Sequence, residues 1–360
     1  MKKIVISGYY GFDNAGDEAI LYSIVESFKD EYEITVLSNN PEKTKKDYGV
    51  KSVDRWNILK VTKAIRESDL LISGGGSLLQ DATSIKNVTY YLAVIKIAQV
   101  HGKKVVVFSQ GVGPVNKKIN RHFINKTLNK VDKVFVRDEN SKKLLLKFGI
   151  DPYLVVTSVD PVIKVEKNQN RVARGKEILS DFTVEDKKTI LISVRDWHFK
   201  NKSLFVENIT KVLNGLSKEE YNILFLPMHY PKDIDISDSI SKNVEGSIVL
   251  KHKYNTSQVI DIIAASDFLI GMRLHSLIIA AAMEVPHFAI SYDPKIESFV
   301  NQLDVTKSHD CDNIDYLIII EELKEMLGEL DKNSMEIYEA KKEVIKKANL
   351  PVDYINSILK

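Results

Sequence analysis

The chain reads Asp267-Phe268-Leu269-Ile270, then Gly271-Met272-Arg273-Leu274-His275-Ser276, then Leu277-Ile278-Ile279-Ala280-Ala281-Ala282-Met283. The first part predicts a short buried strand and the third a buried helix, because both are almost wholly apolar. An arginine and a histidine lie where the strand ends and the helix begins. Open α/β sheets bind ligands at the carboxyl ends of their strands, and a helix N-terminus there adds partial positive charge. The stretch therefore predicts an α/β fold with an anion site at this junction.

The same alternation of short apolar runs and helix-period segments continues along the chain. In the first half we expect strands at 4–7, 34–37, 70–73, 105–108, 134–136 and 154–156, and helices at 18–28, 58–67, 85–100, 119–129 and 141–148. In the second half we expect strands at 189–194, 223–226, 247–250, 268–270 and 287–290, and helices near 204–213, 257–265 and 276–283. The strands are continuously apolar, which is typical of parallel strands covered on both faces. Right-handed βαβ units in a doubly wound sheet follow.

The length of 360 residues favours two domains. A polar stretch over 164–170 has the composition of a linker, and the alternation restarts after it. We therefore expect one Rossmann-like domain over 1–165, a second over 170–330, and a cleft between them. Residues 331–360 are predicted to be a charged helical tail, broken by Pro351, that packs back on the first domain.

Bulk composition excludes several classes of protein. The chain has 51 basic and 49 acidic residues, a net charge of +2, so nothing global favours nucleic acid, and any anion site must be built locally. The single cysteine, Cys311, cannot form an internal disulfide, which fits a reducing cytoplasm. The N-terminus lacks a signal peptide, and no apolar run approaches the roughly 20 residues of a membrane span. A peripheral membrane contact stays open, with the tail and residues 197–200 as candidates.

Basic residues follow several of the expected strands of the second domain. Its expected strands deliver Arg195, His229, Arg273 with His275, and Lys295 to one edge of the sheet. Each residue alone is readily explained as a solvated loop residue or an ion-pair partner, but Arg273 and His275 at one junction favour a site. Guanidinium groups match carboxylate and phosphate oxygens, so the predicted ligand is a small, multiply charged anion.

The first expected strand opens into a glycine-containing loop over 8–18 that carries Asp13, Asn14 and Asp17. The spacing of Gly8, Gly11 and Gly16 does not match a dinucleotide fingerprint, so no nicotinamide or flavin cofactor is expected. The acidic residues suit hydrogen bonds to sugar hydroxyls or a general base. A helix cap is an equal alternative for Asp17.

Two further loops of the first domain are rich in glycine. Residues 74–81 include Gly75, Gly76, Gln80 and Asp81, where glycines indicate close approach of a ligand or of backbone, and Gln80 and Asp81 are candidate sugar contacts. Residues 109–114 form a similar expected loop, and Arg137 follows the next strand. No metal-ligand motif is present, so neither a metal nor a cofactor is predicted. A neutral polyol on this domain and an anion on the other are the simplest match.

Several motifs together resemble the polysaccharide pyruvyl transferase family, in particular its CsaB-type bacterial members. The matching residues are 14–20, 74–81, 111–114, Val136-Arg137-Asp138 with Ser141, Ser193-Val194-Arg195, 271–275 and Ser291-Tyr292-Asp293-Pro294-Lys295. The resemblance implies a glycosyltransferase-B-like fold and transfer of a pyruvyl group from phosphoenolpyruvate to a sugar as a 4,6-ketal, with release of phosphate. For CsaB-like enzymes the sugar is N-acetylmannosamine in a lipid-linked precursor of a secondary cell-wall polymer, which anchors surface-layer proteins.

By motif position, the resemblance places the phosphoenolpyruvate site on Arg273, Leu274, His275 and Lys295, with Arg137 or Arg195 contributing. His275 is the expected general acid, because histidine titrates near neutral pH. Asp13, Asp17 or Asp81 is the expected base for the sugar hydroxyl, with His229, Asn14, Gln80, Gly75 and Gly76 among the substrate contacts. A nucleotide-sugar glycosyltransferase and a non-enzymatic sugar-phosphate binding module are the alternatives. The oligomeric state, homo-oligomer included, is left open.

Overall fold

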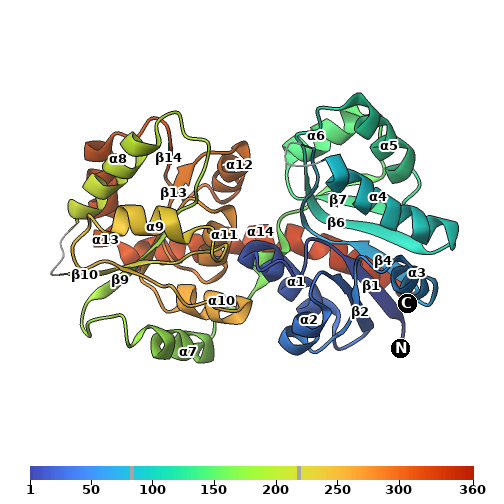
Figure 1. The fold of residues 1–360 in the computed structure, drawn as a ribbon, viewed down its shortest axis with the longest axis horizontal. Coiled ribbons are helices and arrows are strands. Elements are labelled where there is room, and N and C mark those ends of the chain that lie inside the picture. The colour runs from blue at the N-terminus through green and yellow to red at the C-terminus, as the bar shows by residue number, and fades with distance from the viewer. Residues whose placement is uncertain (82–84, 217–219) are drawn as a thin grey trace. The chain divides into compact units, whose positions relative to one another are not determined.

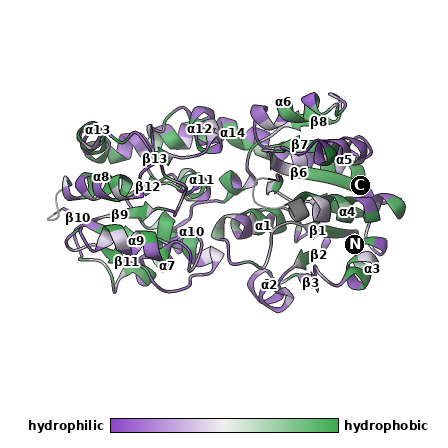
Figure 2. Cartoon of the chain, turned by 45° about the horizontal axis from the view of Figure 1, so that its top comes forward, coloured by the Kyte–Doolittle hydropathy of each residue, from purple (hydrophilic) through white to green (hydrophobic). Residues whose placement is uncertain are grey.

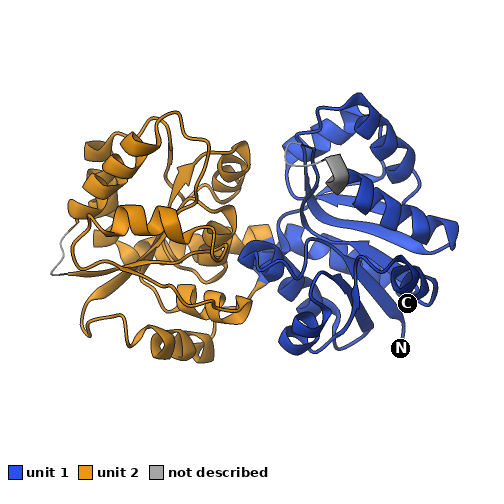
Figure 3. Cartoon of the chain, viewed as in Figure 1, with its two compact units in different colours: residues 1–164, 345–360 blue, residues 165–344 orange. Residues whose placement is uncertain are grey.

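A computed structural model describes residues 1–81, 85–216 and 220–360. The chain forms two compact units (Figure 3). Unit 1 consists of Met1–Lys164 with Ile345–Lys360, and unit 2 of Val165–Val344. Each unit holds its own parallel sheet. The predicted α/β fold class with two parallel-sheet domains is confirmed.

The sheet of unit 1 is parallel throughout and has the order β3-β2-β1-β4-β6-β7-β8, with β5 paired to β6 (Figure 1). Its strands are β1 (Lys3–Ser7), β2 (Glu33–Ser38), β3 (Lys51–Asp54), β4 (Leu70–Ser73), β5 (Gly76–Leu79), β6 (Lys104–Val112), β7 (Lys133–Val136) and β8 (Val155–Thr157). Its helices are α1 (Ala15–Phe28), α2 (Pro41–Tyr48), α3 (Ile58–Arg66), α4 (Ile85–Val100), α5 (Lys118–Leu128) and α6 (Glu139–Lys147), followed by a 3₁₀ turn, η1 (Pro161–Lys164).

The sheet of unit 2 is also parallel, with the order β11-β10-β9-β12-β13-β14. Its strands are β9 (Lys188–Ser193), β10 (Tyr221–Phe225), β11 (Ile248–Val249), β12 (Phe268–Gly271), β13 (His287–Ser291) and β14 (Ser308–Asp310). Its helices are α7 (Gln169–Leu179), α8 (Lys202–Asn214), α9 (Ile234–Ser241), α10 (Thr256–Ala264), α11 (Leu274–Ala282), α12 (Pro294–Leu303) and α13 (Tyr316–Gly328).

Both cores are built from the apolar strands. The central strands β1, β4, β9 and β12 are almost wholly buried, and the long strand β6 is coloured as hydrophobic in Figure 2. Helices cover them, so a parallel strand of this kind reads as a continuous apolar run. Because all strands of a sheet run the same way, their carboxyl ends share one edge. The loops after those ends are therefore placed together, which is what a ligand site on this fold requires.

The C-terminal tail packs on the first domain as predicted, but only with its second half, and Pro351 does not break it. Helix α14 runs over Leu330–Leu359 and contains Pro351 without ending there. Its first half belongs to unit 2, where the Lys341 ammonium donates to Glu284 at 3.0 Å. Its second half belongs to unit 1, where Tyr32 donates to Asn356 at 2.9 Å. Residue 331 is therefore no domain boundary, and packing of both halves keeps the helix continuous through the proline.

Other expectations also change. Residues 109–112 continue β6, and 76–79 form β5, where loops were expected. The expected linker over 164–170 leads directly into α7. Further elements that the sequence did not reveal are the strands β3 and β14, the helices α2, α7, α9, α12 and α13, and the 3₁₀ turn η1. The edge strands β3 and β14 hold no buried residue, so they lack the apolar signal that identified the central strands.

Among the described residues, no helix combines the length and the apolar character needed to cross a bilayer.

Candidate active site

The stretch from Gly271 to Ser276 folds as a tight turn from strand to helix. A Cβ atom on Gly271 would lie 2.6 Å from Leu277 Cδ2 and 2.9 Å from Ser276 Oγ, so only glycine lets α11 pack this closely on β12. Met272 is fully buried. Arg273 is the N-cap of α11 with extended backbone, and His275 is the second residue of the helix. Arg273 and His275 therefore both lie at the carboxyl end of β12, as predicted.

Arg273 is held by a carboxylate that the sequence did not single out. Its guanidinium donates to Asp233, whose side chain is 1% exposed, while the Arg273 side chain is 15% exposed. The other carboxylate oxygen of Asp233 accepts the backbone N–H of His229 at 2.9 Å. Asp233 therefore fixes the loop after β10 to the start of α11.

Arg195 follows β9 and lies between two aromatic rings. Its guanidinium carbon is 4.8 Å from the ring centroids of both Trp197 and Tyr292, and its Nη1 donates to the Tyr292 hydroxyl at 2.6 Å. The two rings are themselves 4.6 Å apart. Trp197 and Tyr292 hold the planar guanidinium in a fixed orientation without neutralising its charge.

The pKa of His229 indicates that these cations lie close to one another. Burial, and next the positive charge of Arg273, lower the pKa of His229 to about 4; Lys232 and Arg195 act in the same direction, and Asp233 opposes them. The strand ends β9, β10 and β12 thus bring Arg195, His229 and Arg273 into one electrostatic field. His229 is neutral at pH 7 in this environment, so the site carries two arginines and an uncharged imidazole.

This shift predicts how stability depends on pH. A histidine whose pKa is near 4 in the fold and 6.5 when unfolded binds protons better in the unfolded chain. The free energy of unfolding should therefore fall as pH drops through the window from 6.5 to 4. His229→Gln should remove about 1–2 kcal/mol of this fall, discounted because the ring is only half buried. Urea unfolding at several pH values measures it.

The variant should reduce the pH dependence without abolishing it. His287 is fully buried and burial lowers its pKa to about 4 as well, so its share of the pH dependence remains. An unchanged pH dependence in His229→Gln would contradict the proposed burial of the neutral ring.

Two other predicted donor contacts have clear positions. Leu274 is the first residue of α11. Lys295 is the second residue of α12, where its backbone N–H donates to the N-cap Asp293 at 3.0 Å. Helix α12 follows β13, the neighbour of β12 in the sheet. Lys295 therefore lies on the same sheet edge as Arg273.

In unit 1 the start of α1 is capped by Asn14 and not by Asp17. The Asn14 side-chain oxygen accepts the Gly16 N–H at 3.2 Å, and its amide donates to Asp17. Asp17 is the third residue of α1 and lies beside the glycine turn after β4, since a Cβ on Gly76 would be 2.7 Å from its Oδ1. Asp17 also raises the pKa of Tyr10, after burial as the main cause. Its carboxylate thus lies at the carboxyl ends of β1 and β4.

Two acidic residues, Asp13 and Glu18, hold the loop before α1. Asp13 has left-handed backbone, with φ of 60°, and its carboxylate is 3.9 Å from the Lys43 ammonium. The buried Glu18 accepts the Gly11 N–H and the Tyr48 hydroxyl, each at 2.7 Å. Glu18 fixes the loop, and burial raises its pKa.

The glycines after β4 lie in close contact with other parts of the protein. A Cβ on Gly74 would meet the Tyr10 hydroxyl at 2.2 Å, and a Cβ on Gly75 would meet Ile20 at 2.9 Å. Gly76 has φ of +88°, which L side chains rarely adopt. Close approach is therefore confirmed, but the approaching groups belong to the protein itself.

Asp81 is poorly suited to be the general base. Its oxygens accept the backbone N–H groups of Asn116 at 2.7 Å and Lys117 at 3.0 Å, and the Asn120 side chain at 3.0 Å. Burial alone would raise the pKa of Asp81, but these hydrogen bonds bring it below its usual value. Asp81 therefore anchors the segment before α5. Its neighbour Gln80 is half buried, at the end of β5.

The two arginines left open by the sequence belong to different units. Arg137 in unit 1 is 6% exposed, with Nη1 at 3.5 Å from Asp160 and Nη2 donating to Ser77 at 3.1 Å. A Cβ on Gly111 would lie 2.7 Å from its Nε. Its charge is thus balanced locally in unit 1. Arg195 lies in unit 2 together with Arg273.

An aromatic cluster in unit 1 was not predicted. The buried guanidinium of Arg55 lies 4.2 Å from the Tyr90 ring centroid and 5.2 Å from each of the rings of Phe12 and Trp56. Tyr9 stacks on Phe12 at 4.1 Å. Trp56 is 63% exposed. The loops after β1 and β3 therefore present an aromatic surface next to Asp13 and Asn14.

Two parallel α/β units give the chain a GT-B-like fold, and solved structures agree. HepE from Anabaena, solved with UDP and glucose, has a TM-score of 0.66 at 11% identity, covering 100% of this chain and 99% of that one. A UDP-GlcNAc 2-epimerase from Neisseria meningitidis, bound to UDP-GlcNAc, has a TM-score of 0.60 at 13% identity over 96% and 99%. At these identities the likeness concerns the fold alone.

The family follows from the sequence match. Residues 14–294 match the model of the polysaccharide pyruvyl transferase family, and the chain belongs to that family. The amylovoran biosynthesis protein AmsJ of Erwinia amylovora is 23% identical over 362 residues, covering 84% of this chain and 86% of that protein. The resemblance inferred from the motifs is confirmed. The chain is a transferase that modifies a polysaccharide.

Proposed function

We propose that this enzyme transfers the pyruvyl group of phosphoenolpyruvate to two hydroxyls of a sugar as a 4,6-ketal and releases phosphate. The acceptor is N-acetylmannosamine in a lipid-linked precursor of a secondary cell-wall polymer that anchors surface-layer proteins. The enzyme works in the cytoplasm and needs no metal or organic cofactor. The observation that carries the proposal is the convergence of Arg195, Arg273 and neutral His229 at three adjacent strand ends.

Phosphoenolpyruvate suits this cation pair. It has one carboxylate and one phosphate, and two guanidinium groups can each engage one of them. Arg273 is already oriented by Asp233, and Arg195 by Tyr292 and Trp197. Preoriented donors cost little rearrangement when charge develops on the leaving phosphate. Lys295 adds a compact charge from the same sheet edge.

The proposed reaction needs one proton donor and one proton acceptor. His275 protonates the methylene carbon, which becomes the methyl group and leaves an oxocarbenium centre at the adjacent carbon. One sugar hydroxyl adds there, the carbon–oxygen bond to phosphate breaks, and the second hydroxyl closes the ring. Asp13 or Asp17 takes the proton of the attacking sugar hydroxyl and passes it to the leaving phosphate, and the proton of the second hydroxyl restores His275.

Residues of unit 1 support the proposed sugar acceptor. Pyranose rings present apolar faces that pack on aromatic side chains, and Trp56 with Tyr9 and Phe12 forms such a surface. Asn14 and Asp17 offer hydrogen bonds for hydroxyl groups beside it. Gln80, at the end of β5, is a further candidate contact.

One assay tests the proposal. The enzyme is incubated with phosphoenolpyruvate and a soluble disaccharide containing N-acetylmannosamine, and phosphate release and product mass are followed. We expect phosphate and product in equal amounts, with the product heavier by a pyruvyl ketal. Product from a UDP-sugar instead would support a glycosyltransferase, and saturable binding of phosphoenolpyruvate with no phosphate release would support a binding module. Either result would overturn the proposal.

A further inference from the structure

One block of the sequence is strongly basic although the chain as a whole is nearly neutral. Residues 82–131 contain no aspartate or glutamate, whereas the whole chain has 49 acidic residues. The block holds nine lysines and arginines, at positions 86, 96, 103, 104, 117, 118, 121, 126 and 130. Helix α5 carries the last part of this block. This excess of positive charge is local, because the net charge of the whole chain is only +2.

The exposed face of α5 combines these cations with large apolar side chains. Ile119 is 55% exposed and Phe123 is 51% exposed, one helical turn apart. Lys118, Arg121 and His122 are exposed beside them. No acidic residue lies in the first turn and the N-cap Lys117 makes no side-chain cap, so these cations oppose the helix dipole. A nearby anion would relieve that repulsion.

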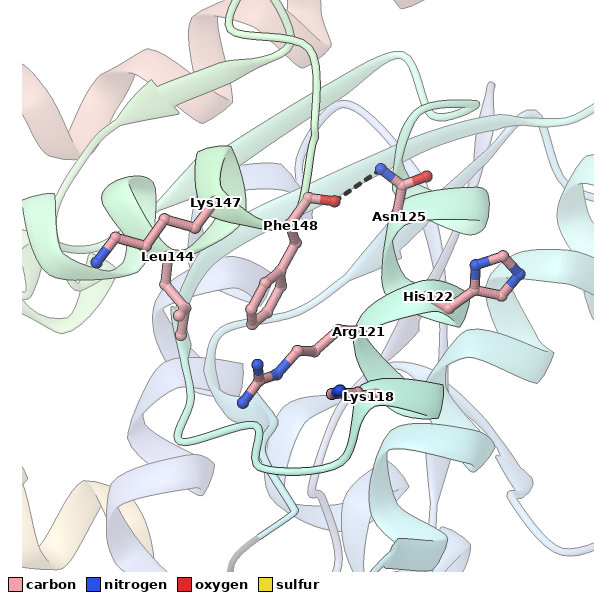
Figure 4. A pocket seen from close by; sticks show the side chains of 7 residues that line it. All are labelled: Lys118, Arg121, His122, Asn125, Leu144, Lys147 and Phe148. Atoms are coloured by element: carbon pink, nitrogen blue, oxygen red, sulfur yellow. Dashed lines mark hydrogen bonds between the residues drawn. The ribbon is translucent and has the colours of Figure 1, made fainter.

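A pocket of about 430 Å³ opens between α5 and α6 (Figure 4). Its lining is Lys118, Arg121, His122, Asn125, Leu144, Lys147 and Phe148. Arg121 donates to the backbone oxygens of Val115 at 2.8 Å and Asn116 at 3.2 Å, and its guanidinium lies 5.7 Å from the Phe148 ring. In the described part of the chain, no carboxylate pairs with Lys118 or Lys147. The nearby Asp81 is 8% exposed and bonded to the backbone.

We propose that this surface docks on an anionic phospholipid bilayer. The α5–α6 surface comprises Lys118, Ile119, Arg121, His122, Phe123 and Lys147. Ile119 and Phe123 insert at the level of the headgroups, and the pocket receives a lipid phosphate between Lys118 and Arg121. Cations alone would suit any polyanion, but exposed aliphatic and aromatic side chains among them favour a membrane interface. The inference does not rest on the proposed reaction.

The test is flotation with lipid vesicles. We expect the full-length protein to bind vesicles with about 30% phosphatidylglycerol at about 0.1 M salt, and not vesicles of phosphatidylcholine alone. The double variant Lys118→Glu with Lys147→Glu should weaken this binding by about 30-fold or more. Arg121 is left in place because it holds backbone oxygens. Ile119→Ser with Phe123→Ser should weaken binding and leave the net charge unchanged.

The matched control reverses two exposed lysines elsewhere in unit 1, Lys46→Glu with Lys60→Glu, and should retain binding. Thermal unfolding checks that each variant is folded. The proposal fails if the wild-type protein does not float with the anionic vesicles, or if the control loses binding to the same extent. It also fails if an RNA oligonucleotide or inorganic pyrophosphate binds this surface while vesicles do not. Because no substrate turnover is measured, failure here leaves the proposed reaction untouched.

Discussion

Replacing His275 with alanine should lower kcat by about 10²–10⁴-fold, because the methylene carbon of the donor then lacks its proton source. His275 lies two residues after Arg273, on the second residue of α11. In the proposed reaction, this position brings His275 to a donor held by Arg273. The KM for phosphoenolpyruvate should change little, since the two arginines that are proposed to bind it remain. Initial rates of phosphate release measure both constants.

Two controls separate proton donation from general damage. His252→Ala removes an exposed imidazole of the same unit and should leave kcat unchanged. In D₂O, the wild-type enzyme should place one deuterium in the methyl group of the ketal, and the residual turnover of His275→Ala should show a larger solvent isotope effect. A His275→Ala variant with wild-type kcat would rule out this residue as the acid.

The sequence correctly predicted that Arg273 and His275 lie at a strand end, because the signals for that position are local. Arg273 and His275 follow an apolar strand and precede an apolar helix, so their position at a strand end needs no tertiary information. Asp233 is different, since it lies 40 residues before Arg273 in the chain. Tyr292 lies 97 residues after Arg195. Such partners depend on strand order, and the order β10-β9-β12-β13 was not predicted.

The acceptor side was predicted less completely for two physical reasons. Trp56 and Arg55 follow β3, an edge strand with no buried residue, so no apolar run marked the loop after it. Glycines gave a real signal of close contact, but a glycine cannot indicate what approaches it. Around Gly74 and Gly75 the approaching groups are Tyr10 and Ile20. Asp81 likewise is an acidic residue in a loop that was predicted to contact the sugar. Its carboxylate oxygens, however, already accept hydrogen bonds from the protein.

Arg273→Gln should abolish measurable turnover, with kcat/KM reduced by about 10³-fold or more. It should also lower the free energy of unfolding by about 3–5 kcal/mol, because the carboxylate of Asp233 is 1% exposed and loses its countercharge. Loss of activity alone is therefore ambiguous, since the variant could simply unfold. Arg273→Lys does not resolve this, because an ammonium lacks the fork that engages two oxygens.

The double variant Arg273→Gln with Asp233→Asn separates the two effects. It removes both charges of the buried pair, while the asparagine oxygen can still accept the His229 N–H that Asp233 accepts now. Urea unfolding should show most of the lost stability restored, whereas phosphate release should stay absent and the affinity for phosphoenolpyruvate should stay low. If activity returned together with stability, the guanidinium would serve only to position the loop after β10. The donor would then have to be bound by Arg195 and Lys295 without it.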